Sequence, residues 1–192
     1  SPEALGKLPS LDLQDIESES ERFPMELKRK SEPKILFHDL FTNKIAYVQI
    51  GFDACSVPLD KIQYLPLIGR LVLGMGTNRH SYVEISQLLG IHTGGLRSWH
   101  FTSATINDHR RILSHVFFSG KALMENADYL FDIWKELILE YDFSNFKRLT
   151  EIIRSAKADM EDAILSSGNH YVLSRLQSYQ SPIGQYNEFT EG

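Results

Sequence analysis

The spacing of hydrophobic and polar residues changes several times along the chain, and each change predicts a different element. Every second residue from Ala46 to Phe52 is apolar, the pattern of a strand with one buried face. Three further strands are expected, at 35–38, 96–103 and 112–122. Asn107-Asp108 forms the turn between the last two, which we expect to pair as an antiparallel hairpin.

Apolar residues at steps of three and four predict helices in other parts of the chain. Residues 62–73 are apolar around nearly the whole circumference, so we expect a largely buried helix that begins near Pro58 and ends at Gly74. Ser81 and Glu84 match a capping box at the start of a short helix. Later helices are expected at 130–141, at 146–164 between an N-cap at Ser144 and a stop at Gly168, and at 171–179, with a loop after Pro182.

The order of these elements predicts an α+β fold, in which helices cover one face of a mainly antiparallel sheet. Residues 1–32 differ from the rest, because three prolines and mixed charges interrupt any helical or strand period. We expect 1–32 to form an interdomain linker or docking arm, with Lys28-Arg29-Lys30 in a solvated loop. Residues 33–192 are expected to form a single domain.

Composition narrows the possible functions. With 192 residues, 42% of them hydrophobic, the chain is long enough for one domain with a core. A formal net charge of -5 argues against a nucleic-acid partner, which would require a basic face. The single cysteine, Cys55, excludes an intramolecular disulfide and a cysteine-based zinc site. No apolar run approaches the roughly 18 residues that span a bilayer, so no membrane partner is expected.

Histidines are the first candidates for chemistry. His80 and Glu84 are four residues apart, but two ligands do not make a catalytic zinc site, and neither HExxH nor HxxEH occurs. His100 and His115 lie on the paired strands and His109 in their turn, so a favourable register would bring three imidazoles together. Because no carboxylate at a fixed offset completes such a shell, we interpret them as structural histidines.

Other candidates also have structural interpretations. His92-Thr93-Gly94-Gly95 does not connect a strand to a helix as a nucleotide-binding loop does, so we expect a tight turn. Trp99, Phe101, Phe117 and Phe118 are expected in the core, and an exposed half of this set would be an interaction surface. The sequence therefore assigns no catalytic, cofactor-binding or metal-binding residue.

Several stretches, in their order and spacing, resemble one family. They are His38-Asp39-Leu40-Phe41-Thr42-Asn43, Tyr64-Leu65-Pro66-Leu67, Gly76-Thr77 through Ser81-Tyr82, Leu88-Leu89-Gly90-Ile91-His92-Thr93-Gly94-Gly95, and Gly120-Lys121-Ala122-Leu123. The chain is similar to the third domain of the presequence-protease and falcilysin-like metallopeptidases of the pitrilysin/insulinase group. The resemblance runs from about Leu8 to Ser181.

This resemblance implies a pitrilysin/mitochondrial-processing-peptidase-like domain, one of four similar α/β domains in a longer chain. Its zinc-binding HxxEH lies in the first domain, which is absent here. Aligning Gly76-Thr77 with the Gly-Thr or Gly-Ser after that motif places Leu67, Arg70 and Leu71 where the two histidines and the glutamate would stand. No shift restores the ligands, because 62–76 contains no histidine, aspartate, glutamate or cysteine.

The expected function is that of a non-catalytic chamber-wall domain in a larger zinc-dependent, peptide-degrading metalloendopeptidase. The chain itself would be inactive and hold no cofactor, and zinc would bind in the parent's catalytic domain. Its partners would be the other domains of the parent chain and the parent's peptide substrate. The alternatives are a free-standing scaffold or binding domain of the same fold and an independent hydrolase using the hairpin histidines. The ends at Ser1 and Gly192 resemble cut ends, which favours a fragment, and a cytoplasmic setting is expected over an organelle matrix.

Overall fold

The structure is a computed structural model that describes residues 12, 15, 22–29 and 33–191. The chain divides into two units, Ser1–Asn43 and Lys44–Gly192. In the first unit, strands β1 (Glu26–Arg29) and β2 (Lys34–Phe37) pair antiparallel. β2 was predicted, but β1 was missed, and Lys28 and Arg29 lie in this strand instead of a loop; Lys30 is outside the described residues.

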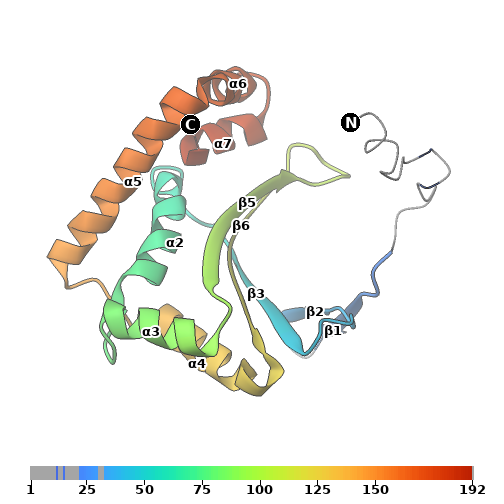
Figure 1. The fold of residues 1–192 in the computed structure, drawn as a ribbon. Helices are drawn as coiled ribbons and strands as arrows, with labels where there is room; N and C mark the ends of the chain where they lie inside the picture. The colour runs from blue at the N-terminus through green and yellow to red at the C-terminus, as the bar shows by residue number, and fades with distance from the viewer. Residues whose placement is uncertain (1–11, 13–14, 16–21, 30–32, 192) are drawn as a thin grey trace, which may run out of the picture. The chain divides into compact units, whose positions relative to one another are not determined.

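A three-stranded antiparallel sheet forms the centre of the second unit (Figure 1). Its order is β3-β6-β5, with β3 at Ile45–Asp53, β5 at Leu96–Ala104 and β6 at Ile112–Leu123. β5 and β6 are the predicted hairpin, and their pairing is confirmed. β3 pairs with the other side of β6, so the sheet joins strands that lie about seventy residues apart in the sequence.

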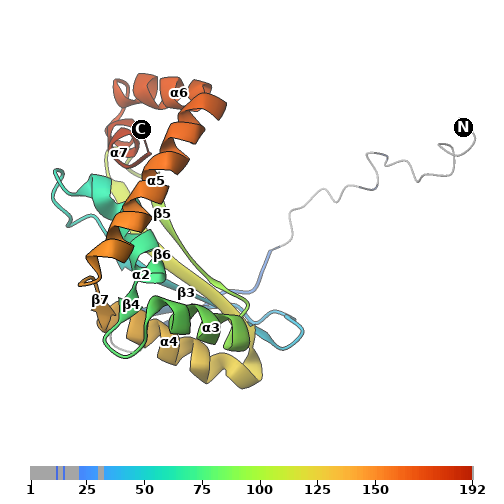
Figure 2. The same cartoon turned by 60° about the vertical axis from the view of Figure 1, so that its left-hand side comes forward.

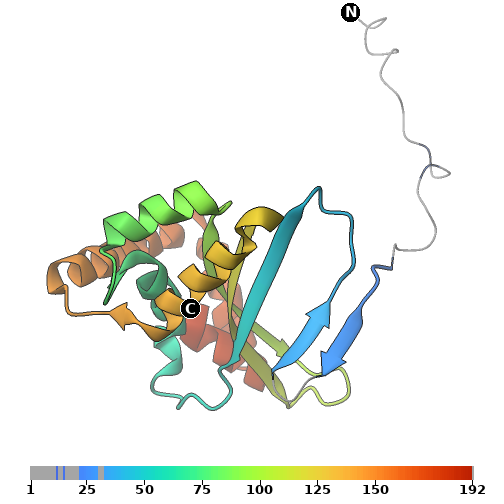
Figure 3. The same cartoon turned by 90° about the horizontal axis from the view of Figure 1, so that it is seen from below.

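Helices surround one side of this sheet, as the sequence predicted (Figures 1 and 2). They are η2 (Ile62–Tyr64), α2 (Leu65–Gly74), α3 (Tyr82–His92), η3 (Met124–Asn126), α4 (Ala127–Leu139), α5 (Phe146–Ser166), α6 (Gly168–Ser178) and α7 (Pro182–Glu191). The short strands β4 (Gly76–Thr77) and β7 (Tyr141–Asp142) pair between them. α3 and α4 lie side by side (Figure 3). The α+β class is confirmed.

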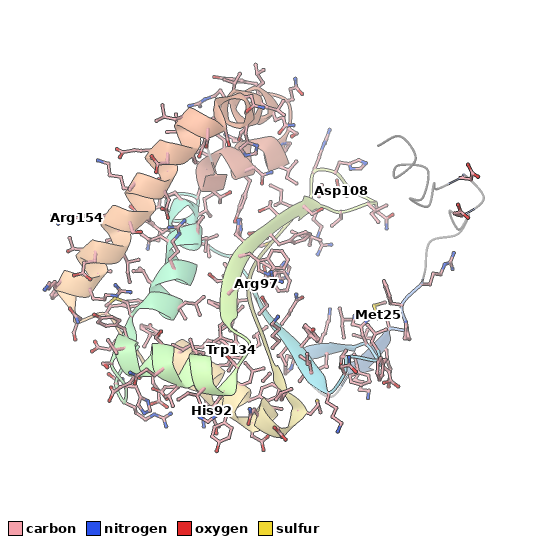
Figure 4. The ribbon with its side chains drawn as sticks, viewed as in Figure 1. Met25, His92, Arg97, Asp108, Trp134 and Arg154 are labelled. Atoms are coloured by element: carbon pink, nitrogen blue, oxygen red, sulfur yellow. The ribbon has the colours of Figure 1, made fainter. Side chains whose placement is uncertain are left out.

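The core lies between the helices and the even-numbered residues of β6. Trp134 of α4 is 1% exposed and makes an edge-to-face contact with Phe118, with ring centroids 5.5 Å apart (Figure 4). Gly120 leaves room for the Leu130 and Trp134 side chains, which a Cβ at that position would meet within 3.2 Å. Such aromatic pairs contribute about 0.5–1.5 kcal/mol beyond the area they bury.

Several predicted helix ends differ from the observed ones. α2 begins seven residues after Pro58, and Pro66 takes the first-turn position, where a missing N–H costs least. The Ser81–Glu84 capping box is confirmed, but the helix it starts continues to His92. Asn145 is the N-cap of α5, since its side chain accepts from the Arg148 amide at 3.1 Å.

The prediction of a loop after Pro182 is wrong. The Ser181 hydroxyl accepts a hydrogen bond from the Gly184 amide at 3.1 Å, and Pro182 is the first residue of α7. A serine cap followed by a proline at the first helical position is a strong start signal. Gly168 likewise begins α6 instead of closing the preceding segment. In both cases a residue interpreted as a terminator opens a new helix.

A buried chain of hydrogen bonds ties α7 to the sheet. Ser114 on β6 is fully buried, and its hydroxyl lies 2.8 Å from the Tyr186 hydroxyl and 2.8 Å from Nε2 of His100. The His100 and Tyr186 rings also stack, with centroids 6.0 Å apart. Because Ser114 is shielded from water, its polar hydroxyl requires these partners.

Replacing Tyr186 by phenylalanine should therefore destabilise the unit by about 1 kcal/mol, because one buried hydrogen bond is lost while the ring remains. Urea unfolding at pH 7 measures the change. Tyr179→Phe is the matched control, since Tyr179 is 80% exposed, and we expect it to stay within about 0.5 kcal/mol of the wild type. Equal stability of both variants would contradict the proposed role of α7.

Candidate functional site

The face of the sheet opposite the core carries the most exposed aromatic residues of the sheet. The register places odd-numbered residues of the three strands together on this face. We call these residues the open face: Ile45, Tyr47, Gln49, Gly51 and Asp53 of β3; Arg97, Trp99, Phe101 and Ser103 of β5; Leu113, His115, Phe117, Ser119, Lys121 and Leu123 of β6. Apolar and basic side chains therefore lie side by side on one surface.

Three aromatic rings form the centre of the open face. Trp99 and Phe117 are paired in register and stack, with centroids 4.7 Å apart and planes 18° from parallel. Phe101 meets both rings edge-on, at 6.0 Å from Trp99 and 6.3 Å from Phe117. A Cβ at Gly51 would lie 2.6 Å from the Phe117 ring, so the absence of a side chain there lets the ring cross β3.

These rings are only partly shielded, which corrects the prediction that the whole aromatic set lies in the core. Trp99 is 38% and Phe101 40% exposed. Phe118 alone of the four is buried, since it points to the opposite face of β6. The alternation of a strand separates neighbouring residues in this way, so the exposed half that the sequence anticipated is the open face.

The cations of the open face lie next to these rings. Arg97 is two residues before Trp99 on β5, and its Nε donates to the Ser119 hydroxyl at 3.0 Å (Figure 4). Lys121 follows Ser119 by two residues on β6, and its aliphatic stem crosses Gly94. Within the described residues, no carboxylate oxygen lies within 4.0 Å of either cationic group.

The histidines of the hairpin do not converge. His100 lies on the helix side, paired with Val116, whereas His115 lies on the open face, paired with Phe101. The register therefore places the two imidazoles on opposite sides of the sheet, and His109 is in the turn. Within the described residues, no three histidine, cysteine, aspartate or glutamate side chains form a metal-binding group.

The residues of α2 that stand at the zinc-motif positions have structural contacts. Leu71 is buried in the core, and Arg70 donates through Nη1 to Asp159 of α5 at 2.5 Å. A guanidinium cannot bind a metal cation, and leucine has no donor atom. This part of α2 therefore does not fit zinc, and its side chains instead position α2 and α5.

A buried carboxylate lies near the end of α2. Glu136 of α4 is 5% exposed and accepts hydrogen bonds from the Thr77 hydroxyl and, at 2.8 Å, from Nδ1 of His80. Nε of Arg79 lies 3.9 Å from Glu136, while its guanidinium binds both oxygens of Glu140 at 2.6 Å. These contacts join the β4 segment to α4.

Opposing effects set the pKa of Glu136. Burial raises it, but the hydrogen bonds from Thr77 and His80 and the charges of His80 and Arg79 favour the ionised form more strongly, so the pKa lies below its usual value. A lowered folded-state pKa contributes stability that is present above the unfolded pKa and disappears as the pH falls through the folded one. The carboxylate thus stabilises the unit at neutral pH.

The His92–Gly95 segment is the tight turn that was expected. The Thr93 hydroxyl donates to the Leu89 carbonyl at 2.8 Å and accepts from the Gly95 amide at 3.1 Å. Gly95 has φ of 96°, a conformation that glycine adopts readily. His92 stacks on Tyr129 with centroids 4.1 Å apart, beside a cavity of about 260 Å³ between α3 and α4.

A comparison with known protein families identifies the chain. The family described as Peptidase M16-C associated matches residues 1–192, the whole chain. The chain belongs to this peptidase-associated family. The expectation from the sequence stretches around Gly76-Thr77 and His92–Gly95 is thus confirmed.

Relatives of this peptidase-associated domain include much longer proteins. Presequence protease 1 of Arabidopsis thaliana, chloroplastic/mitochondrial, is 32% identical over 187 residues, 97% of this chain and 17% of that protein. Protein HypA of Clostridium perfringens is 32% identical over 190 residues, 99% and 20% of the two chains. The mitochondrial presequence protease of Saccharomyces cerevisiae is 27% identical over 194 residues, 99% and 19%. The chain spans about a fifth of the length of these relatives.

The peptidase-associated domain is therefore homologous to one part of presequence proteases. Among its described residues, no helix is both long and apolar enough to cross a membrane.

Replacing Glu136 by glutamine should lower stability at pH 7 by about 2 kcal/mol, because the buried hydrogen bonds lose their charge assistance. The difference from the wild type should shrink as the pH falls through the lowered pKa of Glu136, where the wild-type carboxyl also becomes neutral. Urea unfolding between pH 7 and 3 measures it. Glu125→Gln, at an exposed position, is the control; a pH-independent Glu136→Gln difference would contradict this account.

Proposed function

We propose that the chain is a non-catalytic wall domain of a longer zinc-dependent endopeptidase that degrades peptides. Family membership supports the link to proteolysis, and the side chains of α2 support the absence of catalysis in this domain. Because Leu67, Arg70 and Leu71 do not fit zinc, no step of bond cleavage is assigned to them. The domain would enclose and position peptides while chemistry takes place elsewhere in the protein.

The observation that carries this proposal is the surface of α5. This helix has 21 residues, and none of them is buried. Phe146, Ile153 and Met160 recur every seven residues and are 74%, 44% and 54% exposed. A seven-residue apolar repeat is the pattern by which one helix packs along another element.

The exposed apolar surface continues onto α6. Val172, Leu173 and Leu176 are each more than half exposed. Large contiguous apolar patches are uncommon on proteins that work alone and mark interfaces. We call the exposed apolar residues of α5 and α6, with the residue that follows α6, the docking stripe: Phe146, Ile153, Met160, Ile164, Val172, Leu173, Leu176 and Tyr179.

The docking stripe lies on a rigidly held helix. Arg70 ties α5 to α2 through Asp159, and Nε of Arg148 donates to the Gly74 carbonyl at 3.0 Å, capping the end of α2. The stripe is thus presented in a fixed position. The proposed partners are other domains of the same long protein, which would cover it.

Cysteine accessibility tests this proposal. In a Cys55→Ser background, Met160→Cys should react with a maleimide at least tenfold more slowly in the full-length protein than in the 192-residue chain. Ser155→Cys is the matched control, because Ser155 lies on the opposite, polar side of α5 and is exposed. It should react at similar rates in both proteins.

Equal reactivity of Met160→Cys in both proteins would show that the docking stripe remains uncovered. That outcome would overturn the wall-domain proposal and favour a scaffold domain that meets separate partners. Slower reaction of both cysteine variants would indicate a general effect of the larger protein, and would also count against a specific interface on the stripe.

A further inference from the structure

We propose that the open face binds an extended peptide segment in which an acidic and an aromatic side chain point to the same side. This inference deepens the proposed function and rests on it, since the wall of a peptide chamber would meet its substrate on such a surface. It is argued from the aromatic rings at the centre of the face and from the two cations beside them. The helix side of the same sheet is filled by the core and offers no comparable surface.

The cations determine the sign of the partner's charge. Arg97 and Lys121 have no carboxylate partner within 4.0 Å among the described residues. Both are oriented by contacts with uncharged groups, Arg97 by Ser119 and Lys121 by Gly94. Ser119 itself is buried, so the Arg97 guanidinium is anchored at one edge while its remaining donors are available. A carboxylate is the complementary ligand for such a fork.

The negative group of the open face lies at its other end. Asp53 is paired with His115 in register, toward the opposite end of β6 from Lys121, and its Oδ1 accepts from the Cys55 amide at 2.8 Å. Positive charge therefore gathers at the Arg97 end of the face, and the aromatic rings lie between the two ends. A bound peptide would place its acidic residue at the Arg97 end.

The spacing of the face matches that of an extended chain. Arg97 and Trp99 are two residues apart on β5, about 6.6 Å along the strand. Side chains at positions i and i+2 of an extended peptide lie at the same separation and on the same side. An acidic residue and an aromatic residue two positions later can thus contact Arg97 and the Trp99–Phe117 stack together. A helical ligand would place such residues on different sides.

Tryptophan fluorescence offers a direct test, because the chain has two tryptophans with opposite exposure. Trp134 is 1% and Trp99 38% exposed, so acrylamide quenching reports mainly Trp99. The probe is a blocked octapeptide with threonine at odd positions and glutamate and phenylalanine alternating at even positions. We expect saturable protection of Trp99 from acrylamide when this peptide is added to the 192-residue chain, and no such change in Trp99→Phe.

Charge variants test the specificity. Arg97→Gln combined with Lys121→Gln should weaken binding about tenfold, the effect of losing roughly 1.4 kcal/mol of charge-assisted hydrogen bonding. Added salt should weaken binding to the wild type as well. A peptide with lysine in place of glutamate should bind at least tenfold more weakly, and unchanged near-ultraviolet circular dichroism would show that the variant is folded.

Three results would overturn the proposal: no saturable protection, equal binding of the lysine peptide, or equal binding by the double variant. These outcomes are distinct from a failure of the proposed function. Loss of peptide binding with Met160→Cys still protected in the full-length protein would remove only the open-face proposal. Peptide binding with an unprotected docking stripe would leave a peptide-binding domain that is not a wall.

Discussion

The rest of the structure depends on the burial of one face of a three-stranded sheet. Phe118, Ala122 and Val116 of β6 pack against α4, whose Trp134 lies at the centre of the core. Since a strand alternates its side chains, burying one face necessarily presents the other. The single layer of helices therefore creates both the stable core and the open face, and each strand contributes to both surfaces.

Polar contacts complete this arrangement at two points where the chain would otherwise be loosely held. Ser114 joins α7 to the sheet through Tyr186, and Glu136 joins α4 to the β4 segment through Thr77 and His80. Both groups are buried, so each requires hydrogen-bond partners. These contacts use the side chains that in another protein of this size would be candidates for catalysis. The polar groups of the domain thus hold its shape, and its apolar surfaces are left for recognition.

Much of the fold could be predicted from local patterns, because the determining interactions are local. The alternation from Ala46 to Phe52 and the Ser81–Glu84 capping box each act within a few residues, and both are confirmed. α7 was missed because Pro182 either ends or begins a helix, and only Ser181 before it indicates which. The core position of Phe118 and the partial exposure of its neighbour Phe117 depend on which face the helices cover. Register across strands has no local signal, which is why the separation of His100 from His115 emerged only from the structure.

The central claim is that this domain contributes surfaces to a peptidase and no catalytic centre of its own. The most direct test is elemental analysis of the purified 192-residue chain for bound zinc, with cleavage of an unstructured peptide measured in the same sample. The account predicts no stoichiometric zinc and no cleavage above background. About one zinc per chain, together with cleavage that a chelator abolishes, would show that the chain holds a catalytic site and would contradict it.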